Sequence, residues 1–211
     1  MAQVATLPRR TTAVRGGPNN AVAPGGRSGD NNVVVMTETS VGEVCRLLDS
    51  QDLRYWVIGG WGVDALLGRC TREHKDLDVL LVLSQHERAW RVLHEKGYRF
   101  AYTWEENVDV PGTLMDSGVQ PTAYVLEHPS GGQVDVHVID DRSPEPRPLW
   151  STNRRFSSGA LDAQGTIDRL PVHCMSAHMQ LVAHEGYELP ETHQGDVAKL
   201  RELLGNGRPS D

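Results

Sequence analysis

The spacing of apolar residues along the chain changes between a helical and an alternating period, which predicts a mixture of helices and strands. Ordered structure is expected to begin near Thr37, where apolar residues at helical spacing follow. The expected helices lie at 41–48, 63–67, 84–93, 176–186 and 194–204. The expected strands lie at 55–58, 78–83, 98–102, 123–127 and 133–139. Because the sheet comes first and helices come last, we expect an α+β fold: a mixed β-sheet flanked by helices, with a short C-terminal helical portion.

Polar residues and glycines mark the expected ends of these elements. Ser40 with Glu43, and Ser84 with Glu87, have the spacing of a capping box, in which two polar residues close the first turn of a helix. Gly68 is expected to end the helix at 63–67. The run HPSGG at 128–132 predicts a hairpin between the two strands on either side of it.

The remaining segments are expected to be irregular. Residues 1–35 are rich in Gly, Pro, Ala, Asn and Arg without periodicity, which predicts a disordered tail. Residues 36–211 then form one domain, whose C-terminal helices occupy about 172–205. Residues 103–121 are expected to form a loop, and 140–170 a longer loop over the functional site.

Composition and charge exclude several classes of protein. The formal net charge of −7 argues against a general nucleic-acid binder, because phosphate contacts need clustered Lys and Arg. The acidity favours cationic small substrates through long-range steering, or it only keeps the protein soluble. The three cysteines show no CxxC spacing, so neither a zinc site nor a disulfide framework is expected, and a reducing cytoplasm fits. Apolar runs are too short to span a membrane, so no membrane partner is expected.

The candidate chemistry begins with Asp76 and Asp78, which lie two residues apart where the chain enters a strand. Side chains alternate along a strand, so both carboxylates share one face. Adjacent carboxylates near a buried sheet repel each other, and a divalent cation between them relieves the repulsion. Hard oxygen ligands in small number suit Mg²⁺. If the strand that contains Asp135 pairs nearby, the third acid completes a set able to hold two metals for in-line phosphoryl displacement.

A strand that ends in Gly59-Gly60 and opens a helix allows backbone N–H groups to approach phosphate oxygens closely. We expect Arg72 to add a charge-assisted hydrogen bond to the same phosphate. His74 and His137 flank the acids, and each either contacts phosphate, orients a carboxylate or is only structural. Asp64 is expected to be structural, capping or holding the region around Arg72.

The order of these motifs resembles the nucleotidyltransferase superfamily that includes DNA polymerase beta. More closely, GGWGVDALLGR at 59–69 and TREHKDLD at 71–78 resemble the small aminoglycoside 2''-adenylyltransferases and lincosamide nucleotidyltransferases. The resemblance continues more thinly through 132–137, 170–176 and 184–188, and it covers most of 40–204.

This resemblance implies a nucleotidyltransferase-type sheet and a cytoplasmic enzyme active in antibiotic resistance. Such an enzyme uses Mg²⁺ and a nucleoside triphosphate, ATP first, to place a nucleoside monophosphate, AMP, on a hydroxyl of an aminoglycoside- or lincosamide-type antibiotic. The residues matched are Asp76 and Asp78 as metal ligands, Asp135 as a metal ligand or the general base, Gly59 and Gly60 as the phosphate loop, and Arg72 and His74 near the nucleotide.

Two other functions fit the same motifs. One is a nucleotidyltransferase that modifies a macromolecule, as in antitoxin-type protein adenylylation. The other is a non-enzymatic binding module on a decayed fold, although all three acids are present. The sequence leaves open the acceptor, the preferred nucleotide, and whether the protein is a monomer or a homodimer.

Overall fold

The computed structural model describes residues 13–15, 35–104, 109–111, 119–142, 145–149, 155–185 and 188–206. The described strands of the main sheet are β1 (Ala13–Arg15), β2 (Tyr55–Ile58), β3 (Asp76–Val82), β4 (Arg99–Trp104), β7 (Ala123–Glu127), β8 (Gln133–Asp140), β9 (Arg147–Pro148), β10 (Ala163–Ile167) and β11 (Leu170–Cys174). A separate pair consists of β5 (Asp109–Pro111) and β6 (Val119–Pro121). The described helices are α1 (Glu38–Ser50), α2 (Gly59–Leu67), α3 (His86–Glu95), α4 (Ala177–Ala183) and α5 (Glu191–Asn206), with a 3₁₀ turn at Leu83–Gln85.

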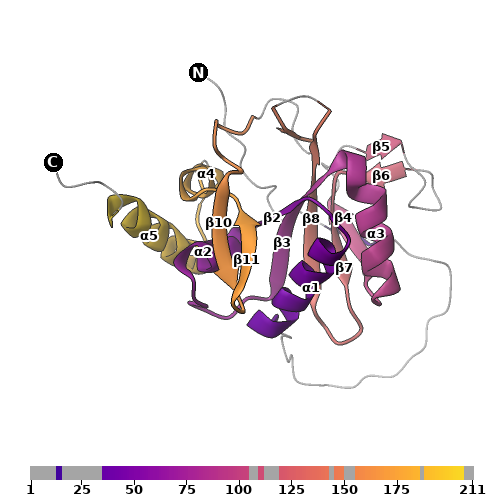
Figure 1. Ribbon diagram of the computed structural model, residues 1–211, viewed down its shortest axis with the longest axis horizontal. Coiled ribbons are helices and arrows are strands. Elements are labelled where there is room, and N and C mark those ends of the chain that lie inside the picture. The colour runs from indigo at the N-terminus through magenta and orange to yellow at the C-terminus, as the bar shows by residue number, and fades with distance from the viewer. Residues whose placement is uncertain are drawn as a thin grey trace.

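One mixed sheet forms the centre of the molecule, which confirms the expected α+β class (Figure 1). Its strand order is β1-β4-β7-β8-β3-β2-β11-β10, and β9 pairs with β8. The β3–β8 and β2–β11 pairs are parallel, and the other ladders in the described part of the chain are antiparallel. The hairpin expected around 128–132 is confirmed, because β7 and β8 pair antiparallel on either side of it.

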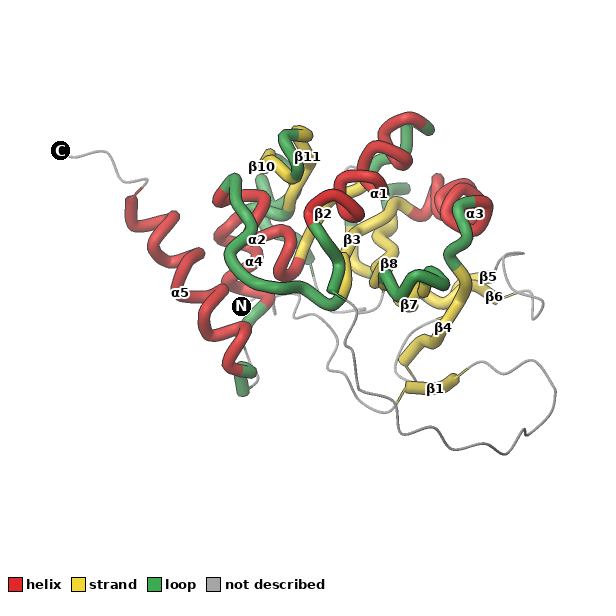
Figure 2. Tube along the Cα trace, turned by 90° about the horizontal axis from the view of Figure 1, so that it is seen from below, coloured by secondary structure: helices red, strands yellow, loops and turns green. Residues whose placement is uncertain are grey.

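Helices cover the sheet in two groups. Figure 2 shows α1 and α3 together on one face, whereas α2, α4 and α5 gather near β10 and β11. The larger apolar core lies under α1 and α3, where Leu77, Val79 and Val136 pack with α1 residues such as Val44. On the other face a smaller core joins strand residues to α4 and the segment before it. Its buried members are Ile58, Leu80, Val82, Ile139, Ala160, Met175 and Met179. In the described part of the chain, no helix has both the length and the apolar character needed to cross a membrane.

Both expected capping boxes are wrong. Thr37 is the N-cap of α1, where Ser40 N donates to Thr37 Oγ1 at 3.1 Å and Thr37 N donates to Ser40 Oγ at 2.9 Å. The box therefore begins three residues earlier than expected. Ser84 lies in the 3₁₀ turn, one residue before the N-cap of α3, and its hydroxyl donates to Asp141 Oδ2 at 2.6 Å. Gln85 is the N-cap of α3 and makes no side-chain capping bond.

Helix α2 begins at Gly59 rather than at residue 63, with no loop after β2. Gly59 has φ of +62°, a conformation that glycine adopts without the usual steric penalty, and it turns the chain directly from strand into helix. The expected end at Gly68 is confirmed, since Gly68 is a left-handed C-cap with φ of +68°.

The expectation that 140–170 is one long loop is wrong. This segment contains β9 and β10, and β10 forms an antiparallel hairpin with β11. Only Ile167 of β10 is fully buried, so the sequence of this strand shows no alternation of apolar and polar residues. The loop expected at 103–121 contains the end of β4 and the β5–β6 pair, and the rest lies outside the described residues.

Of the N-terminal segment 1–35, the structure describes Val35 and Ala13–Arg15. The latter form β1, an antiparallel partner of β4, where disorder was expected. The other residues of that segment lie outside the described part, so their disorder stays a prediction.

Candidate active site

The three acids singled out in the sequence lie together on one face of the sheet. In the parallel β3–β8 ladder, Asp78 pairs with Asp135 and Asp76 pairs with Gln133. Paired residues in such a ladder point to the same side, and residues two apart on a strand share a face. Asp76, Asp78 and Asp135 therefore face away from the core that contains Leu77. Asp135 is buried, at 3% exposed, while the Asp78 side chain remains 21% exposed.

His137 extends this face by one more polar residue. It lies two residues after Asp135 on β8 and is buried. Its Nε2 atom is 3.9 Å from Asp78 Oδ1, an ion-pair distance only when the imidazole is protonated. The structure thus places His137 beside the acids, and its role there stays a prediction.

Gly59 brings the start of α2 against the Asp78 carboxylate. Ile58, the last residue of β2, pairs with Asp78 in the antiparallel β2–β3 ladder, so Gly59 follows directly at that edge. A Cβ atom added at Gly59 would overlap Asp78 Oδ2 and lie 2.9 Å from Asp78 Cγ. Only glycine leaves room for this approach. The backbone N–H groups of the first turn of α2 therefore lie beside the acids, which is the arrangement that binds phosphate at a helix start.

Gly60 is packed just as tightly against Arg72 and His74. An added Cβ there would overlap Arg72 Nη2 and lie 2.5 Å from His74 Nδ1. Arg72 is half-buried, and three of its hydrogen bonds go to Asp196 on α5. Burial alone would lower the pKa of Arg72, but the contacts with Asp196 raise it, so the side chain stays cationic. The expected phosphate-loop glycines and the two expected nucleotide contacts thus lie together at the first turn of α2.

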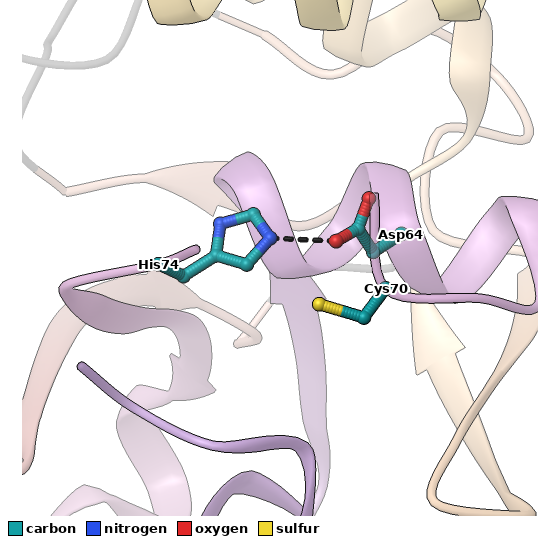
Figure 3. A group of neighbouring side chains, drawn as sticks. All are labelled: Asp64, Cys70 and His74. Atoms are coloured by element: carbon teal, nitrogen blue, oxygen red, sulfur yellow. Dashed lines mark hydrogen bonds and ion pairs between the residues drawn. The ribbon is translucent and has the colours of Figure 1, made fainter. Parts of the chain in front are cut away.

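Asp64 organises the loop between α2 and β3 (Figure 3). His74 Nε2 lies 2.6 Å from Asp64 Oδ2, and Thr71 donates to the same carboxylate through its backbone N–H at 2.9 Å and through its hydroxyl. Burial would raise the pKa of Asp64, but the bonds from His74 and Thr71 outweigh it and hold that pKa below its usual range. The prediction of a structural Asp64 fits these contacts. The ring of His74 also packs against Trp61, with centroids 4.5 Å apart.

Cys70 completes the side-chain group of Figure 3. One ligand-type atom from each of Asp64, Cys70 and His74 lies within 4.8 Å of the other two. The Cys70 thiol donates to the carbonyl oxygen of Arg72 at 3.1 Å. Burial and then the charge of Asp64 raise the pKa of this thiol, so it stays protonated at neutral pH. These groups form a hydrogen-bonded support under the first turn of α2.

Helix α5 contributes a residue to this region that the sequence motifs did not indicate. Asp196 is 1% exposed and lies on the helix face that buries Val197 and Leu200. An acid on an apolar helix face was the available signal, because such a charge needs a partner. His193, one turn earlier, lies against His184, with ring centroids 5.2 Å apart. Burial, followed by the neighbouring His184, lowers the pKa of His193, so it is neutral near pH 7.

Comparison with known proteins identifies the relatives of this chain. The model of the aminoglycoside-2''-adenylyltransferase family matches residues 40–200. A lincosamide resistance protein of Staphylococcus haemolyticus is 29% identical over 177 residues, which cover 82% of this chain and 98% of that protein. The crystal structure of the lincosamide antibiotic adenylyltransferase LnuA with lincomycin bound aligns with a TM-score of 0.66 at 25% identity, covering 81% of this chain and 99% of LnuA.

A second solved structure supports the fold alone. ANT(2'')-Ia in complex with adenylyl-2''-tobramycin aligns with a TM-score of 0.58 at 20% identity, covering 80% of this chain and 90% of that chain. The family match spans most of the described domain, including the acids, the glycine turn and the start of α5. The chain therefore belongs to the aminoglycoside-2''-adenylyltransferase family and is a nucleotidyltransferase.

Proposed function

We propose that this enzyme transfers AMP from ATP, with Mg²⁺, to a hydroxyl group of a lincosamide antibiotic. The observation that carries the proposal is the in-register pairing of Asp78 with Asp135 on parallel strands, with Asp76 on the same face. Gly59 adds the phosphate-binding half of the site, because it places the start of α2 against the Asp78 carboxylate.

The donor set fits Mg²⁺. Three carboxylates lie on one face of β3 and β8 near the same end of both strands, and one of them, Asp135, is buried. Such clustered negative charge is costly without a cation, and hard oxygen ligands in small number suit Mg²⁺, which keeps water and phosphate oxygens as further ligands. When bound, Mg²⁺ neutralises charge on the phosphates and polarises the reacting oxygens. Asp76, Asp78 and Asp135 are the residues that would hold it.

The residues of this chain have separate roles in the reaction. The acceptor hydroxyl oxygen forms a bond to the α-phosphorus of ATP, and the bond from that phosphorus to pyrophosphate breaks in line. Asp135, next to Asp78, takes the hydroxyl proton. The backbone of Gly59 and Gly60 and the side chain of Arg72 bind the phosphates and stabilise the charge that develops on them.

The choice of a lincosamide as acceptor rests on the comparisons. The similarity to the lincosamide resistance protein extends over nearly the whole of that protein. LnuA was solved with lincomycin bound and aligns over nearly its full length, with a higher TM-score than ANT(2'')-Ia. An aminoglycoside is the alternative acceptor of the same reaction, and the acidic net charge of this chain is compatible with that cationic class.

Mass spectrometry tests the proposal. The enzyme is incubated with Mg²⁺, each of the four nucleoside triphosphates, and either lincomycin or tobramycin. We expect pyrophosphate release and a mass gain of one AMP on lincomycin, with ATP preferred and with no reaction in EDTA. A mass gain on tobramycin alone would refute the lincosamide assignment, and no gain on either compound would refute antibiotic modification.

A matched pair of variants on one strand links the activity to the site. Asp135→Asn removes a candidate site carboxylate, whereas Asp140→Asn makes the same change at the far end of β8. There Arg142 binds Asp140 at 2.8 Å and lowers the pKa of that carboxyl to about 2. We expect Asp135→Asn to be inactive and Asp140→Asn to be active.

A further inference from the structure

An ion pair between Asp196 and Arg72 links the C-terminal helix α5 to the candidate active site. Asp196, near the start of α5, accepts hydrogen bonds from Arg72 Nε, 3.2 Å from each carboxylate oxygen, and from Arg72 Nη2, 2.7 Å from Oδ2. Because Asp196 is 1% exposed, water screens this contact little. A two-pronged carboxylate contact fixes the plane of a guanidinium group as well as its position.

The same guanidinium lies against the first turn of α2. A Cβ atom at Gly60 would overlap Arg72 Nη2, so the contact is close. The start of a helix is electropositive, and it repels a neighbouring cation. Asp196 supplies the negative charge that offsets this repulsion, and it comes from a segment more than a hundred residues away in the chain.

We propose that Asp196 is a positioning residue for nucleotidyl transfer, which holds Arg72 at the first turn of α2 in the orientation that meets the triphosphate. This inference rests on the proposed function, because it takes a triphosphate to bind at Gly59 and Gly60. Asp196 contacts neither substrate in this account and acts through Arg72. A purely structural ion pair would tie α5 to the body of the protein and leave nucleotide affinity unchanged.

Nucleotide binding separates the two roles. Calorimetry measures the Kd of the full-length protein for a non-hydrolysable ATP analogue with Mg²⁺, for wild type and for Asp196→Asn. We expect the Kd to rise at least about tenfold, because a misoriented guanidinium loses charge-assisted bonds to phosphate. In the transfer assay, KM for ATP should rise while KM for the acceptor changes little.

Asp168→Asn is the matched control. Asp168 also pairs with an arginine from a distant segment, Arg46, at 2.6 Å, and the described contacts of that pair do not involve the site acids or the start of α2. We expect this variant to keep the wild-type Kd for the analogue. A folded Asp196→Asn protein with the wild-type Kd would overturn the proposal.

Two further variants keep the test decisive if Asp196→Asn does not fold. Asp196→Glu retains the charge that anchors α5 but shifts the guanidinium, so we expect normal thermal unfolding with a raised Kd; an unchanged Kd would overturn the proposal. Arg72→Lys removes the two-pronged contact, and in that background Asp196→Glu should add little to the Kd. If wild type itself fails to bind the analogue, the proposed function fails, whereas normal wild-type binding with an unaffected Asp196 variant refutes only the positioning role.

Discussion

Replacing Gly59 with alanine tests how closely the first turn of α2 packs against Asp78, one of the candidate catalytic carboxylates. Gly59 has φ of +62°, which costs an L-residue about 1–2 kcal/mol. The new methyl group would also lie 2.9 Å from Asp78 Cγ and overlap Oδ2. To reach ordinary contact the carboxylate must retreat by about 1 Å, since non-bonded heavy atoms prefer separations of roughly 3.5–4.0 Å. A displacement of that size at a reacting centre costs about 100-fold in rate.

Gly68→Ala supplies the control for this experiment. Gly68 ends the same helix with φ of +68°, and nothing lies within 4 Å of a Cβ atom built there. Both variants therefore carry the same backbone strain, and a loss of about 1–2 kcal/mol lowers Tm by roughly 2–8 °C in a domain of this size. We expect the Tm of Gly59→Ala to be no higher than that of Gly68→Ala, and kcat/KM to be about 100-fold lower in Gly59→Ala alone. Equal turnover in the two variants would refute the close approach of Gly59 to Asp78.

Three further predictions concern the acids, their support and the packing of β10. Asp76→Asn, Asp78→Asn and Asp135→Asn should each abolish turnover without lowering the Tm of the ligand-free protein, and each should lose the rise in Tm that Mg²⁺ and ATP give the wild type. Normal turnover in any of them contradicts the site. Asp64→Asn should lower the free energy of unfolding by about 2 kcal/mol at pH 7, as measured by urea titration. Since the pKa of Asp64 is lowered by folding, its stabilisation is full above the unfolded pKa and lost as pH falls through the folded value. The difference from wild type should therefore narrow below about pH 4, and a difference independent of pH would count against a charged Asp64. Gly165→Ala should lower the free energy of unfolding by about 1–3 kcal/mol, because its Cβ would lie 2.5 Å from a backbone carbonyl carbon of α2. Gly195→Ala, at an open position of α5, should be neutral or stabilising. Equal effects of the two changes would show that β10 packs loosely.

The shared face of the acids on each strand was predictable, because the alternation of side chains along a strand depends only on local sequence. Asp76 and Asp78 had to share a face once the strand was recognised, and the alternation through Asp135 gave its strand in the same way. Which strands pair, and in which register, is decided by non-local contacts. The parallel alignment of Asp78 with Asp135 was therefore a hypothesis until the ladder itself was seen.

The missed features have physical causes of their own. Strand β10 lies at the end of the sheet order and has a single buried residue, Ile167, so it carries no apolar pattern. Its hairpin turns through Asp168 and Arg169, both with positive φ, rather than through the Asn-Gly or Asp-Gly pairs that signal such turns. The partnership of Arg72 with Asp196 joins residues 124 positions apart, and no local spacing indicates which charges will meet.

Metal binding measured without any acceptor is the most direct test of the account. Electron paramagnetic resonance measures bound Mn²⁺, as a substitute for Mg²⁺, in the presence of a non-hydrolysable ATP analogue. The account predicts tight binding of Mn²⁺ by the wild-type protein and by Asp140→Asn, and weak binding when Asp78 or Asp135 becomes asparagine. Equal Mn²⁺ binding by all four proteins would contradict the claim that the β3–β8 carboxylates form the metal site.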